Sequence, residues 1–288
     1  MKRLIALLLT ALALLAGCAT LDEQQRTWIF QPSDRSWAGG TYAAESMEDV
    51  WIDFTSTITD KPVKLHGLWA QNENFTQRAD APVMLYLHGA RFNVTGSAFR
   101  AQRMQELGFS VLAIDYRGFG KSTNELPSEK KAYEDARAAW DWLGEKYPGR
   151  PRYIFGHSLG GAIAVELAAQ VKDEAGTVVE GTFTSIPDVV STFKWGWLPV
   201  SLLITQRFEA VKRVPDIGSP LLVVHGGEDR LIQPELGRKL FDAATGRKAF
   251  VLVEGGSHHN TNSVGQAQYR VALASLFGLR TDAQVVKN

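Results

Sequence analysis

The chain has 288 residues, enough to bury a substantial core as one α/β unit once a short leader is set aside. Its 31 basic and 31 acidic side chains balance, which gives no electrostatic basis for binding nucleic acid. A single cysteine in the full sequence excludes an intrachain disulfide. The sequence shows no phosphate-binding glycine loop and no metal-ligand spacing of histidines, cysteine or acids, so no metal or other cofactor is expected.

The first residues predict a secretory leader. Lys2 and Arg3 precede an apolar run over residues 4–15, which is too short to span a bilayer as a mature helix. The run ends in Leu15-Ala16-Gly17-Cys18, which matches the bacterial lipobox, where the cysteine becomes the acylated first residue of the mature chain. We therefore expect residues 1–17 to be a lipoprotein signal peptide and Cys18 to carry the lipid.

Lipid attachment predicts a membrane-anchored protein. Removal of Lys2 and Arg3 with the leader leaves 29 basic against 31 acidic residues, so adsorption to anionic lipid by charge is not expected and the lipid must anchor the chain. Ala19 follows the cysteine where an aspartate would signal inner-membrane retention. By resemblance to Gram-negative lipoproteins, this indicates the outer membrane, facing the periplasm. The sequence specifies no oligomeric state.

The region after the leader divides into a lead-in segment and a single large domain. Residues 18–48 contain glutamine, serine, glycine and scattered aromatics, and they predict a tether and lead-in loop. Loosely alternating apolar residues then predict an edge hairpin over 50–55 and 63–69. The domain is expected over residues 49–280, with 281–288 as a tail.

Strands and helices alternate through the rest of the domain. The strands are expected at 82–87, 110–114, 152–155, 177–183, 220–225 and 249–253. The helices are expected at about 97–107, 128–146, 161–171, 234–243 and 263–277. This alternation predicts an α/β fold whose mostly parallel, doubly wound sheet is covered by helices on both faces.

The segment Gly156-His157-Ser158-Leu159-Gly160 joins an apolar strand to an alanine-rich helical stretch. It fits the G-x-S-x-G nucleophile elbow in the strand–turn–helix setting that this motif requires, which makes Ser158 a candidate nucleophile. The turn is sharp enough to strain the backbone, so only residues without large side chains fit beside the serine. The alternative is a glycine-rich connection whose serine only caps the helix.

A serine hydroxyl becomes a strong nucleophile when a histidine takes its proton and an acid orients that histidine. Asp229 follows one expected strand, and His258 and His259 follow the next, at the strand ends where α/β folds place their sites. Asp229 is preferred over the neighbouring Glu228 because of its spacing from His225-Gly226. Counting from the preceding Glu-Gly pair favours His258, whereas reading the His-Asn pair as a unit favours His259. Both remain candidates, with His258 preferred.

Such a site must also stabilise an oxyanion. One donor is expected to be the backbone amide of Leu159, directly after the serine, and the other should come from a loop after an earlier strand. The segment His88-Gly89-Ala90 is that loop, with the Ala90 amide as donor. The alternative for this loop is an ordinary strand-to-helix turn.

Together these motifs resemble the α/β-hydrolase superfamily. The segment from Asp115 to Ser122, DYRGFGKS, is similar to the DYRG-[FY]-G-x-S segment of a membrane-associated branch with a small cap, which includes protein depalmitoylases, lysophospholipid lipases and bacterial esterases. Asn93 also matches an asparagine that this branch tends to carry. Ala90 departs from it, since the branch often has asparagine there.

The resemblance implies an α/β-hydrolase fold and a serine hydrolase that cleaves ester or thioester bonds through an acyl-enzyme, without a cofactor. The implied substrates are small-molecule or lipid esters. A lysophospholipase or acyl-protein thioesterase is the more specialised alternative. The alternative that is not an enzyme is a catalytically inactive lipoprotein that binds a ligand.

An apolar, aromatic segment over residues 185–219 interrupts the alternation and predicts a short helical cap over the site. Phe193, Trp195, Trp197 and Leu198 are candidates for the wall of a substrate pocket, since ligand clefts are lined by such side chains. Packing on the domain core and contact with the bilayer surface are the alternatives.

Overall fold

The structure is a computed structural model that describes residues 17, 19–33, 40–75, 77–193 and 199–279. The strands are β1 Glu48–Thr55, β2 Pro62–Ala70, β3 Val83–Leu87, β4 Ser110–Ile114, β5 Arg152–His157, β6 Glu174–Glu180, β7 Leu221–Gly226 and β8 Lys248–Val253. The α-helices are α2 Gly40–Glu45, α3 Val94–Glu106, α4 Glu129–Lys146, α5 Leu159–Gln170, α6 Ile186–Ser191, α7 Ala210–Arg213, α8 Pro234–Ala243, α9 Thr261–Val264 and α10 Gln266–Phe277. The 3-10 helices are η1 Glu73–Phe75, η2 Pro199–Leu203 and η3 Val214–Asp216.

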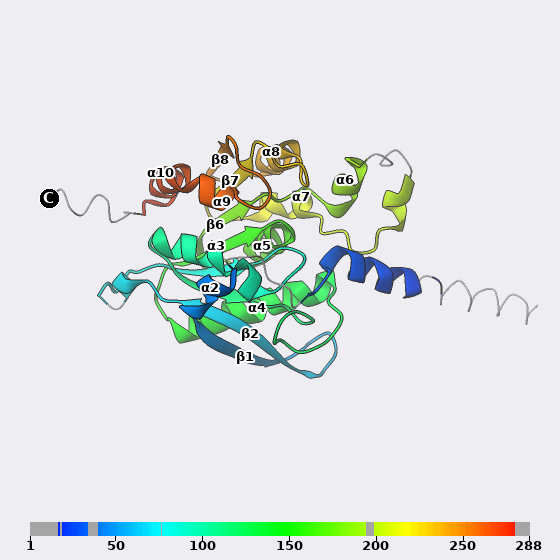
Figure 1. Cartoon of the computed structure of the whole chain (residues 1–288), viewed down its shortest axis with the longest axis horizontal. Coiled ribbons are helices and arrows are strands. Elements are labelled where there is room, and N and C mark those ends of the chain that lie inside the picture. Colours follow the sequence, from blue (N-terminus) through cyan, green and yellow to red (C-terminus); the bar gives the residue numbers. More distant parts are fainter. Residues whose placement is uncertain (1–16, 18, 34–39, 76, 194–198, 280–288) are drawn as a thin grey trace, which may run out of the picture.

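The strands form an eight-stranded sheet in the order β1-β2-β4-β3-β5-β6-β7-β8. The pairs β1–β2 and β2–β4 are antiparallel, and the pairs from β4 to β8 are parallel. Helices lie on both sides of this twisted sheet (Figure 1). The expected α/β-hydrolase fold, with an edge hairpin and a mostly parallel sheet, is confirmed.

The two faces of the sheet are covered by separate apolar cores, as the alternation of side chains along β3 illustrates. Leu85 and Leu87 belong to the core that includes residues of α4, α5 and α8, whereas Met84 and Tyr86 belong to the core that includes residues of α3 and α10. All five residues of β3 are therefore buried, as expected for a parallel strand covered on both faces.

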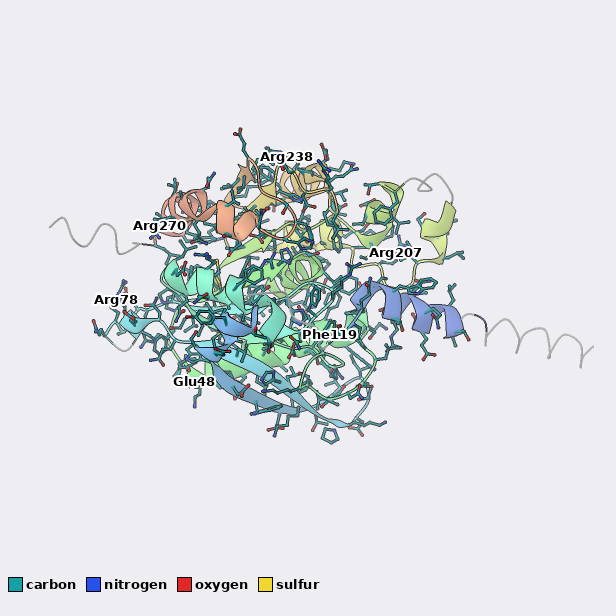
Figure 2. All side chains as sticks on the ribbon, viewed as in Figure 1. Glu48, Arg78, Phe119, Arg207, Arg238 and Arg270 are labelled. Carbon is teal, nitrogen blue, oxygen red and sulfur yellow. The ribbon has the colours of Figure 1, made fainter. Side chains whose placement is uncertain are left out.

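Charged side chains lie mainly outside these cores. Figure 2 shows a set of labelled charged side chains at the periphery of the molecule, while the labelled aromatic ring of Phe119 lies inside. The charged set is Glu48, Arg78, Arg207, Arg238 and Arg270. The few buried charges are therefore exceptions that need partners.

Two expected elements have different bounds in the structure. The strand expected at 177–183 is β6 and ends at Glu180, because Gly181 has a φ of 56° and turns the chain out of the sheet. The helix expected at 263–277 is divided into α9 and α10 at Gly265. Residues 181–183, which were expected in this strand, instead form a loop that leads to the site described below.

The lead-in loop expected over residues 18–48 is wrong for residues 19–30 and 40–45, which are helical. The ring of Phe30 is fully buried, with its centroid 5.7 Å from that of Phe208. The Gln25 amide donates to the Leu203 carbonyl at 2.7 Å, and Arg26 Nε donates to the Pro127 carbonyl at 2.7 Å. These contacts fix the first helix on the domain, beside the cap (Figure 1).

The expected cap over residues 185–219 contains the short elements α6, η2, α7 and η3. Among the described helices, none combines the length and the apolar character needed to cross a bilayer. Residues 1–16 of the expected signal peptide, Cys18 and the expected tail over 281–288 lie outside the described residues.

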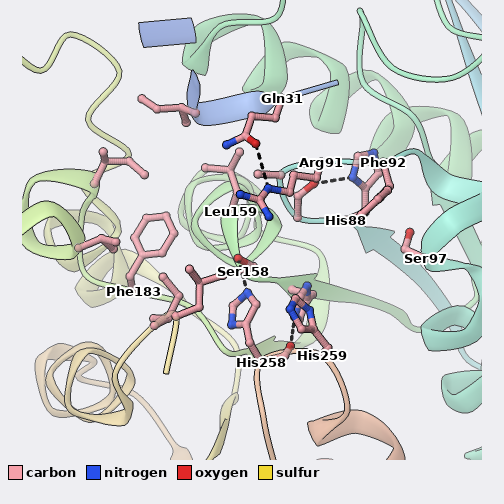
Figure 3. A pocket seen from close by; sticks show the side chains of 18 of the residues that line it. Gln31, His88, Arg91, Phe92, Ser97, Ser158, Leu159, Phe183, His258 and His259 are labelled. Carbon is pink, nitrogen blue, oxygen red and sulfur yellow. Dashed lines mark hydrogen bonds between the residues drawn. The ribbon is translucent and has the colours of Figure 1, made fainter. Parts of the chain in front are cut away.

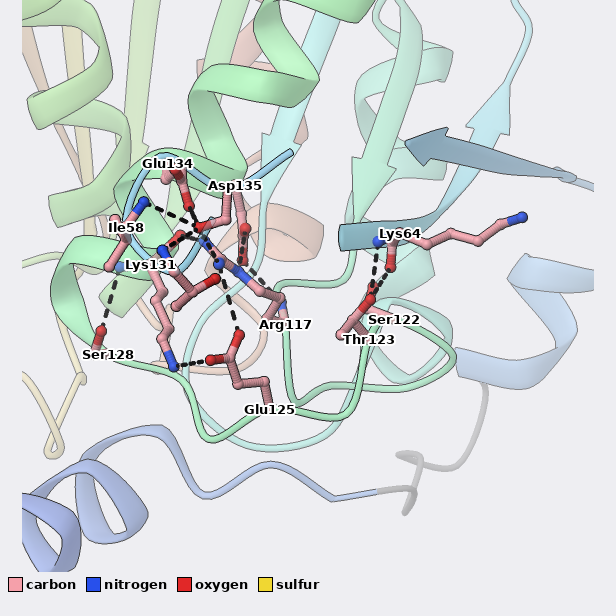
Figure 4. A network of polar contacts seen from close by, with 12 residues as sticks. Ile58, Lys64, Arg117, Ser122, Thr123, Glu125, Ser128, Lys131, Glu134 and Asp135 are labelled. Carbon is pink, nitrogen blue, oxygen red and sulfur yellow. Dashed lines mark hydrogen bonds and ion pairs between the residues drawn. The ribbon is translucent and has the colours of Figure 1, made fainter. Parts of the chain in front are cut away.

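Arg117, the arginine of the DYRG segment, forms a buried polar network (Figure 4). Arg117 is fully buried, and its guanidinium donates to Asp135 Oδ1 at 2.8 Å, to Ser56 Oγ at 3.1 Å and to Glu134 Oε2 at 2.5 Å. Because Ser56 follows β1 and both carboxylates belong to α4, the network joins the hairpin to that helix. Its role in the structure is therefore to hold elements together at a distance from the elbow.

The two carboxyl groups of this network have opposite pKa shifts. Burial raises the pKa of Asp135 to about 7 despite its contacts with Arg117. Burial also acts to raise the pKa of Glu134, but hydrogen bonds from Ser56, Thr57 and Arg117 outweigh it and hold that pKa at about 2. Glu134 is thus ionised wherever the fold is intact and the pH is above that value.

We predict that Glu134→Gln lowers the free energy of unfolding by about 1.5–3 kcal/mol at neutral pH, the usual contribution of a hydrogen bond to a charged group. The pKa of Glu134 in the folded protein, about 2, lies below the usual glutamate pKa of 4.5, so this contribution is present above about pH 4.5 and is lost as the pH falls toward 2. Urea unfolding of both proteins over this range measures the difference.

Glu106→Gln is the matched control, because that carboxylate forms an exposed pair with Arg103 on α3. Exposed pairs contribute about 0–1 kcal/mol, so this variant should differ little from the parent. A Glu134→Gln deficit that stays constant down to pH 2 would contradict the assignment.

Candidate active site

Ser158 lies at the turn from β5 to α5 with a φ of 56° and a ψ of −121°. A non-glycine residue in this region of the backbone is strained, and such strain is typical of functional turns. The serine occupies the N-cap position of α5, but its side chain makes no capping hydrogen bond. Instead Ser158 Oγ lies 3.0 Å from His258 Nε2.

The glycines of the elbow are required by close backbone contacts. A Cβ on Gly160 would lie 2.1 Å from the carbonyl oxygen of Leu87, at the end of β3. A Cβ on Gly156 would lie 2.3 Å from the carbonyl oxygen of Gly160. The turn is therefore pressed against the central strand, and this contact sets where Ser158 stands relative to the loop after β3.

Asp229 and His258 continue the chain of hydrogen bonds from Ser158. His258 Nδ1 lies 2.7 Å from Asp229 Oδ2, and Asp229 Oδ1 accepts hydrogen bonds from the amides of Leu231 and Ile232 at 2.9 and 2.8 Å. Burial acts to raise the pKa of Asp229, but hydrogen bonds from His225, His258 and the Ile232 amide outweigh it and hold that pKa well below its usual range. The carboxylate is therefore ionised and faces Nδ1 of His258.

The structure separates the two adjacent histidines. His258 is buried between Ser158 and Asp229, whereas His259 is exposed and its ring stands edge-on to that of His258 at 5.3 Å. Burial, together with the charges of His258 and Arg100, lowers the pKa of His259. Glu228, the alternative acid, is exposed. The geometry thus brings together Ser158, Asp229 and His258.

The two expected oxyanion donors lie beside the serine. Ala90 and Leu159 both line the same pocket as Ser158. The preceding loop residue, Gly89, is so close that a Cβ there would be 3.1 Å from Ser158 Cβ. Within the described part of the chain, neither the Ala90 nor the Leu159 amide has a hydrogen-bond partner. Both amides are therefore available to an oxygen atom bound near Ser158.

Arg100 is a residue of this site that the sequence interpretation missed. It is buried on α3, and its Nη2 donates to the carbonyl oxygens of His258 and His259 at 3.3 and 3.1 Å. Its Nε donates to the buried carboxylate of Glu180 at 3.1 Å, which also accepts a hydrogen bond from Tyr269. Arg100 therefore fixes the loop that carries His258. A lone arginine in an amphipathic helix gives no sequence signal for such a contact.

The variable residue of the elbow, His157, belongs to the same network. Its Nε2 lies 3.0 Å from Arg100 Nη2 and 2.9 Å from the carbonyl oxygen of His258. Burial and the charge of Arg100 lower the pKa of His157 well below its usual value, so this ring is neutral. It packs at 4.9 Å from the ring of His258 and helps to fix that side chain.

Ser158 opens into a pocket of about 370 Å³ (Figure 3). One wall is apolar and comes from the cap and from the loops after β6 and β7: Phe183, Ile186, Val189, Val190, Phe193, Leu231 and Ile232. Polar side chains line other parts of it: Gln31, Arg91, Ser97, Arg100 and His259. The size and the mixed lining suit a small organic ligand.

Of the four residues expected to form a pocket wall, only Phe193 can be placed. It lines the pocket and is 51% exposed. Trp195, Trp197 and Leu198 lie outside the described residues. Asn93, which the family resemblance singled out, accepts from the Gly96 amide at 2.9 Å and caps α3. In the described parts of the chain, no group of three or more histidine, cysteine or acidic side chains is arranged to hold a metal ion.

The fold that carries this elbow serine, buried histidine and carboxylate is shared with known proteins. The family model described as "Serine aminopeptidase, S33" matches residues 78–208 and 187–263. The chain therefore belongs to this family of α/β-hydrolases, and its membership supports hydrolase activity.

The individual proteins that this chain resembles include an uncharacterized protein, a lipase and an esterase. An uncharacterized protein of Mycobacterium tuberculosis is 32% identical over 265 residues, which are 90% of each chain. Lysophosphatidylserine lipase ABHD12 of Danio rerio is 31% identical over 187 residues, covering 58% of this chain and 48% of that lipase. An esterase of Pyrococcus furiosus has the same fold, with a TM-score of 0.65 and 20% identity over 86% of this chain and 98% of its own.

We predict that Gly160→Ala lowers the free energy of unfolding by about 1–3 kcal/mol or more, because the added methyl group would overlap backbone atoms that cannot move independently. Gly218→Ala is the control, since a Cβ there meets nothing within 4 Å. Its effect should stay within about 1 kcal/mol. Urea unfolding compares the two, and equal stabilities would show that the elbow is not tightly packed on β3.

Proposed function

We propose that this protein is a serine hydrolase that cleaves carboxylic ester or thioester bonds through an acyl-enzyme. The observation that carries the proposal is the hydrogen-bonded chain from Ser158 through His258 to Asp229, opening into a pocket with an apolar wall. In this proposal Ser158 is the nucleophile, His258 is the general base and Asp229 orients the imidazole.

The proposed reaction has two steps. Ser158 Oγ attacks the acyl carbonyl while His258 Nε2 takes its proton, and the amides of Ala90 and Leu159 stabilise the oxyanion. His258 then gives the proton to the departing alcohol or thiol, which leaves an acyl group on Ser158. A water molecule, deprotonated by His258, attacks this ester, and the acid departs as Ser158 regains its proton. No cofactor takes part.

The apolar wall supports an acyl chain as one half of the substrate. Phe183 belongs to this wall (Figure 3), and Val189 and Phe193 line the same pocket. A lysophospholipid is the more specific candidate substrate, favoured by the similarity to lysophosphatidylserine lipases. An acyl-protein thioesterase is the alternative that shares this chemistry, and a non-catalytic binding lipoprotein is the alternative that does not.

We further propose that the protein is anchored to a membrane by lipid on Cys18, after removal of residues 1–17, and that the anchored protein faces the periplasm from the outer membrane. The catalytic domain in this proposal covers residues 49–280, and the helix over residues 19–30 packs on it. The helix over residues 19–30 supports a close relation between anchor and site, because Trp28, Ile29 and Gln31 line the pocket. At the helical rise of 1.5 Å per residue, Trp28 is about 14 Å along the helix from Ala19, the residue after Cys18 in the sequence.

We predict that Ser158→Ala and His258→Ala each lower kcat for a short-chain ester by about 10⁴-fold or more, because members of such a unit act together. His259→Ala should stay within about tenfold of the parent, since it lies outside the hydrogen-bonded chain. Initial rates with a chromogenic ester measure all three. Fluorophosphonate labelling should be lost in Ser158→Ala. An active Ser158→Ala protein, or greater loss in His259→Ala than in His258→Ala, would contradict the assignment.

We predict that Cys18→Ser moves the protein from the membrane fraction to the soluble periplasmic or unprocessed fraction of a Gram-negative host. Several acyl chains hold a protein far more firmly than one, so loss of the acylated residue removes the anchor. Fractionation with mass spectrometry of the N-terminal peptide tests this. Unchanged membrane association, without an acylated peptide in the parent, would show that Cys18 is not the anchor.

A further inference from the structure

The side chains that line the pocket around Ser158 include cationic groups but no anionic ones among the described residues. Its lining includes two arginines, Arg91 and Arg100, and no aspartate or glutamate among the described residues. Arg100 is buried and paired with the carboxylate of Glu180. Arg91 is exposed and has no acidic partner within salt-bridge distance in the described parts of the chain. One uncompensated cation therefore faces a pocket in a chain whose formal net charge is zero.

The backbone holds Arg91 in a strained conformation. Arg91 and Phe92 have φ values of 68° and 60°, in the left-handed region that non-glycine residues rarely adopt. Two contacts with the N-terminal segment maintain it: the Arg91 amide donates to the Phe30 carbonyl at 2.8 Å, and Pro32 forms a bridge with Phe92. Such strain persists where the surrounding structure imposes it, often at ligand sites.

This backbone directs the side chain over the site. Figure 3 shows Arg91 between Gln31 and Leu159, on the pocket side of the loop that follows β3. Its Nε donates to Gln31 Oε1 at 2.9 Å, which fixes the plane of the guanidinium. The terminal nitrogens have no partner among the described residues and form the forked pair of donors that matches a carboxylate or a phosphate.

The rest of the pocket indicates which half of a substrate would meet this arginine. An acyl chain suits the apolar wall that includes Phe183, whereas Ser97 lies on the other side of Ser158 (Figure 3). The charge of Arg91 also reaches His259, where it contributes to lowering that histidine's pKa. The polar side chains of Gln31 and His259 also line the pocket, so an anionic group on the leaving alcohol would meet Arg91 with other polar groups near it.

We propose that Arg91 is a specificity-determining residue that binds an anionic oxygen group, a phosphate or a carboxylate, on the alcohol half of the ester. This inference rests on the proposed serine hydrolase function and narrows its substrates to esters of negatively charged alcohols. Arg91 acts on binding and orientation of the leaving group, and the reaction steps remain those of Ser158 and His258.

The test uses hexanoate esters that stay monomeric, so that no charged interface contributes. Their alcohols are glycerol, glycerol 3-phosphate and glycerate, which differ in the presence and kind of anion. We expect Arg91→Gln to lower kcat/KM for one or both anionic esters, relative to the glycerol ester, by roughly ten- to a hundredfold and mainly through KM. Arg91→Lys keeps a positive charge but lacks the forked pair of donors. Its kcat/KM for the anionic esters, relative to the glycerol ester, should lie between those of the parent and Arg91→Gln.

Arg103→Gln is the matched control, because it removes one arginine charge from an exposed position on α3 that does not line the pocket. It should leave the ratio of anionic to neutral ester within about twofold, since exposed charges are screened by salt. A loss with the phosphate ester alone would identify a phosphate site, and a loss with the glycerate ester alone a carboxylate site.

An unchanged ratio in Arg91→Gln, or an equal change in Arg103→Gln, would overturn the assignment while leaving the hydrolase function intact. Loss of activity toward a glycerol ester of adipate, whose carboxylate is on the acyl half, without loss for the other anionic esters would also overturn it. If the wild-type protein cleaves none of these esters, the proposed function and this inference fall together. Thermal unfolding of each variant separates these outcomes from misfolding.

Discussion

The contact between the elbow and the end of β3 is the constraint on which the site depends. A side chain on Gly160 would overlap the carbonyl oxygen of Leu87, so the first turn of α5 sits directly on the central strand. This contact leaves Ser158 with a left-handed backbone and brings Gly89 to within van der Waals distance of it. The nucleophile candidate and the amide donors beside it are thus positioned by one packing interaction, before any polar contact is considered.

Buried charges then orient the remaining groups. Arg100 joins α3 to the loop of His258 and to Glu180 on β6, and all of these groups are withdrawn from water. Removing one partner of such a pair leaves an uncompensated buried charge, which is why buried pairs tend to fix a single arrangement rather than add net stability. Arg117 likewise joins separate elements at the other side of the sheet, where its hydrogen bonds hold the hairpin against α4. These buried pairs therefore tie neighbouring elements of the fold to one another.

Local patterns predicted most of the fold and the residues that the site brings together. Buried apolar strands such as β3 and β7, and the motif around Ser158, carry their information in consecutive residues. The helix over residues 19–30 could not be predicted, because its position depends on the burial of Phe30 and on bonds to distant carbonyl oxygens. The difference between His258 and His259 is likewise set by the path of a loop. Composition gives no information on which of two adjacent side chains turns inward.

The central claim is that the hydroxyl of Ser158 is transiently esterified during turnover. Mass spectrometry of the protein, quenched in acid while it hydrolyses an excess of a chromogenic hexanoate ester, tests this directly. We expect a hexanoyl adduct on the peptide that contains Ser158, formed as fast as the first equivalent of alcohol is released. Steady product release with no adduct, or an adduct on another residue that forms at the rate of turnover, would contradict it.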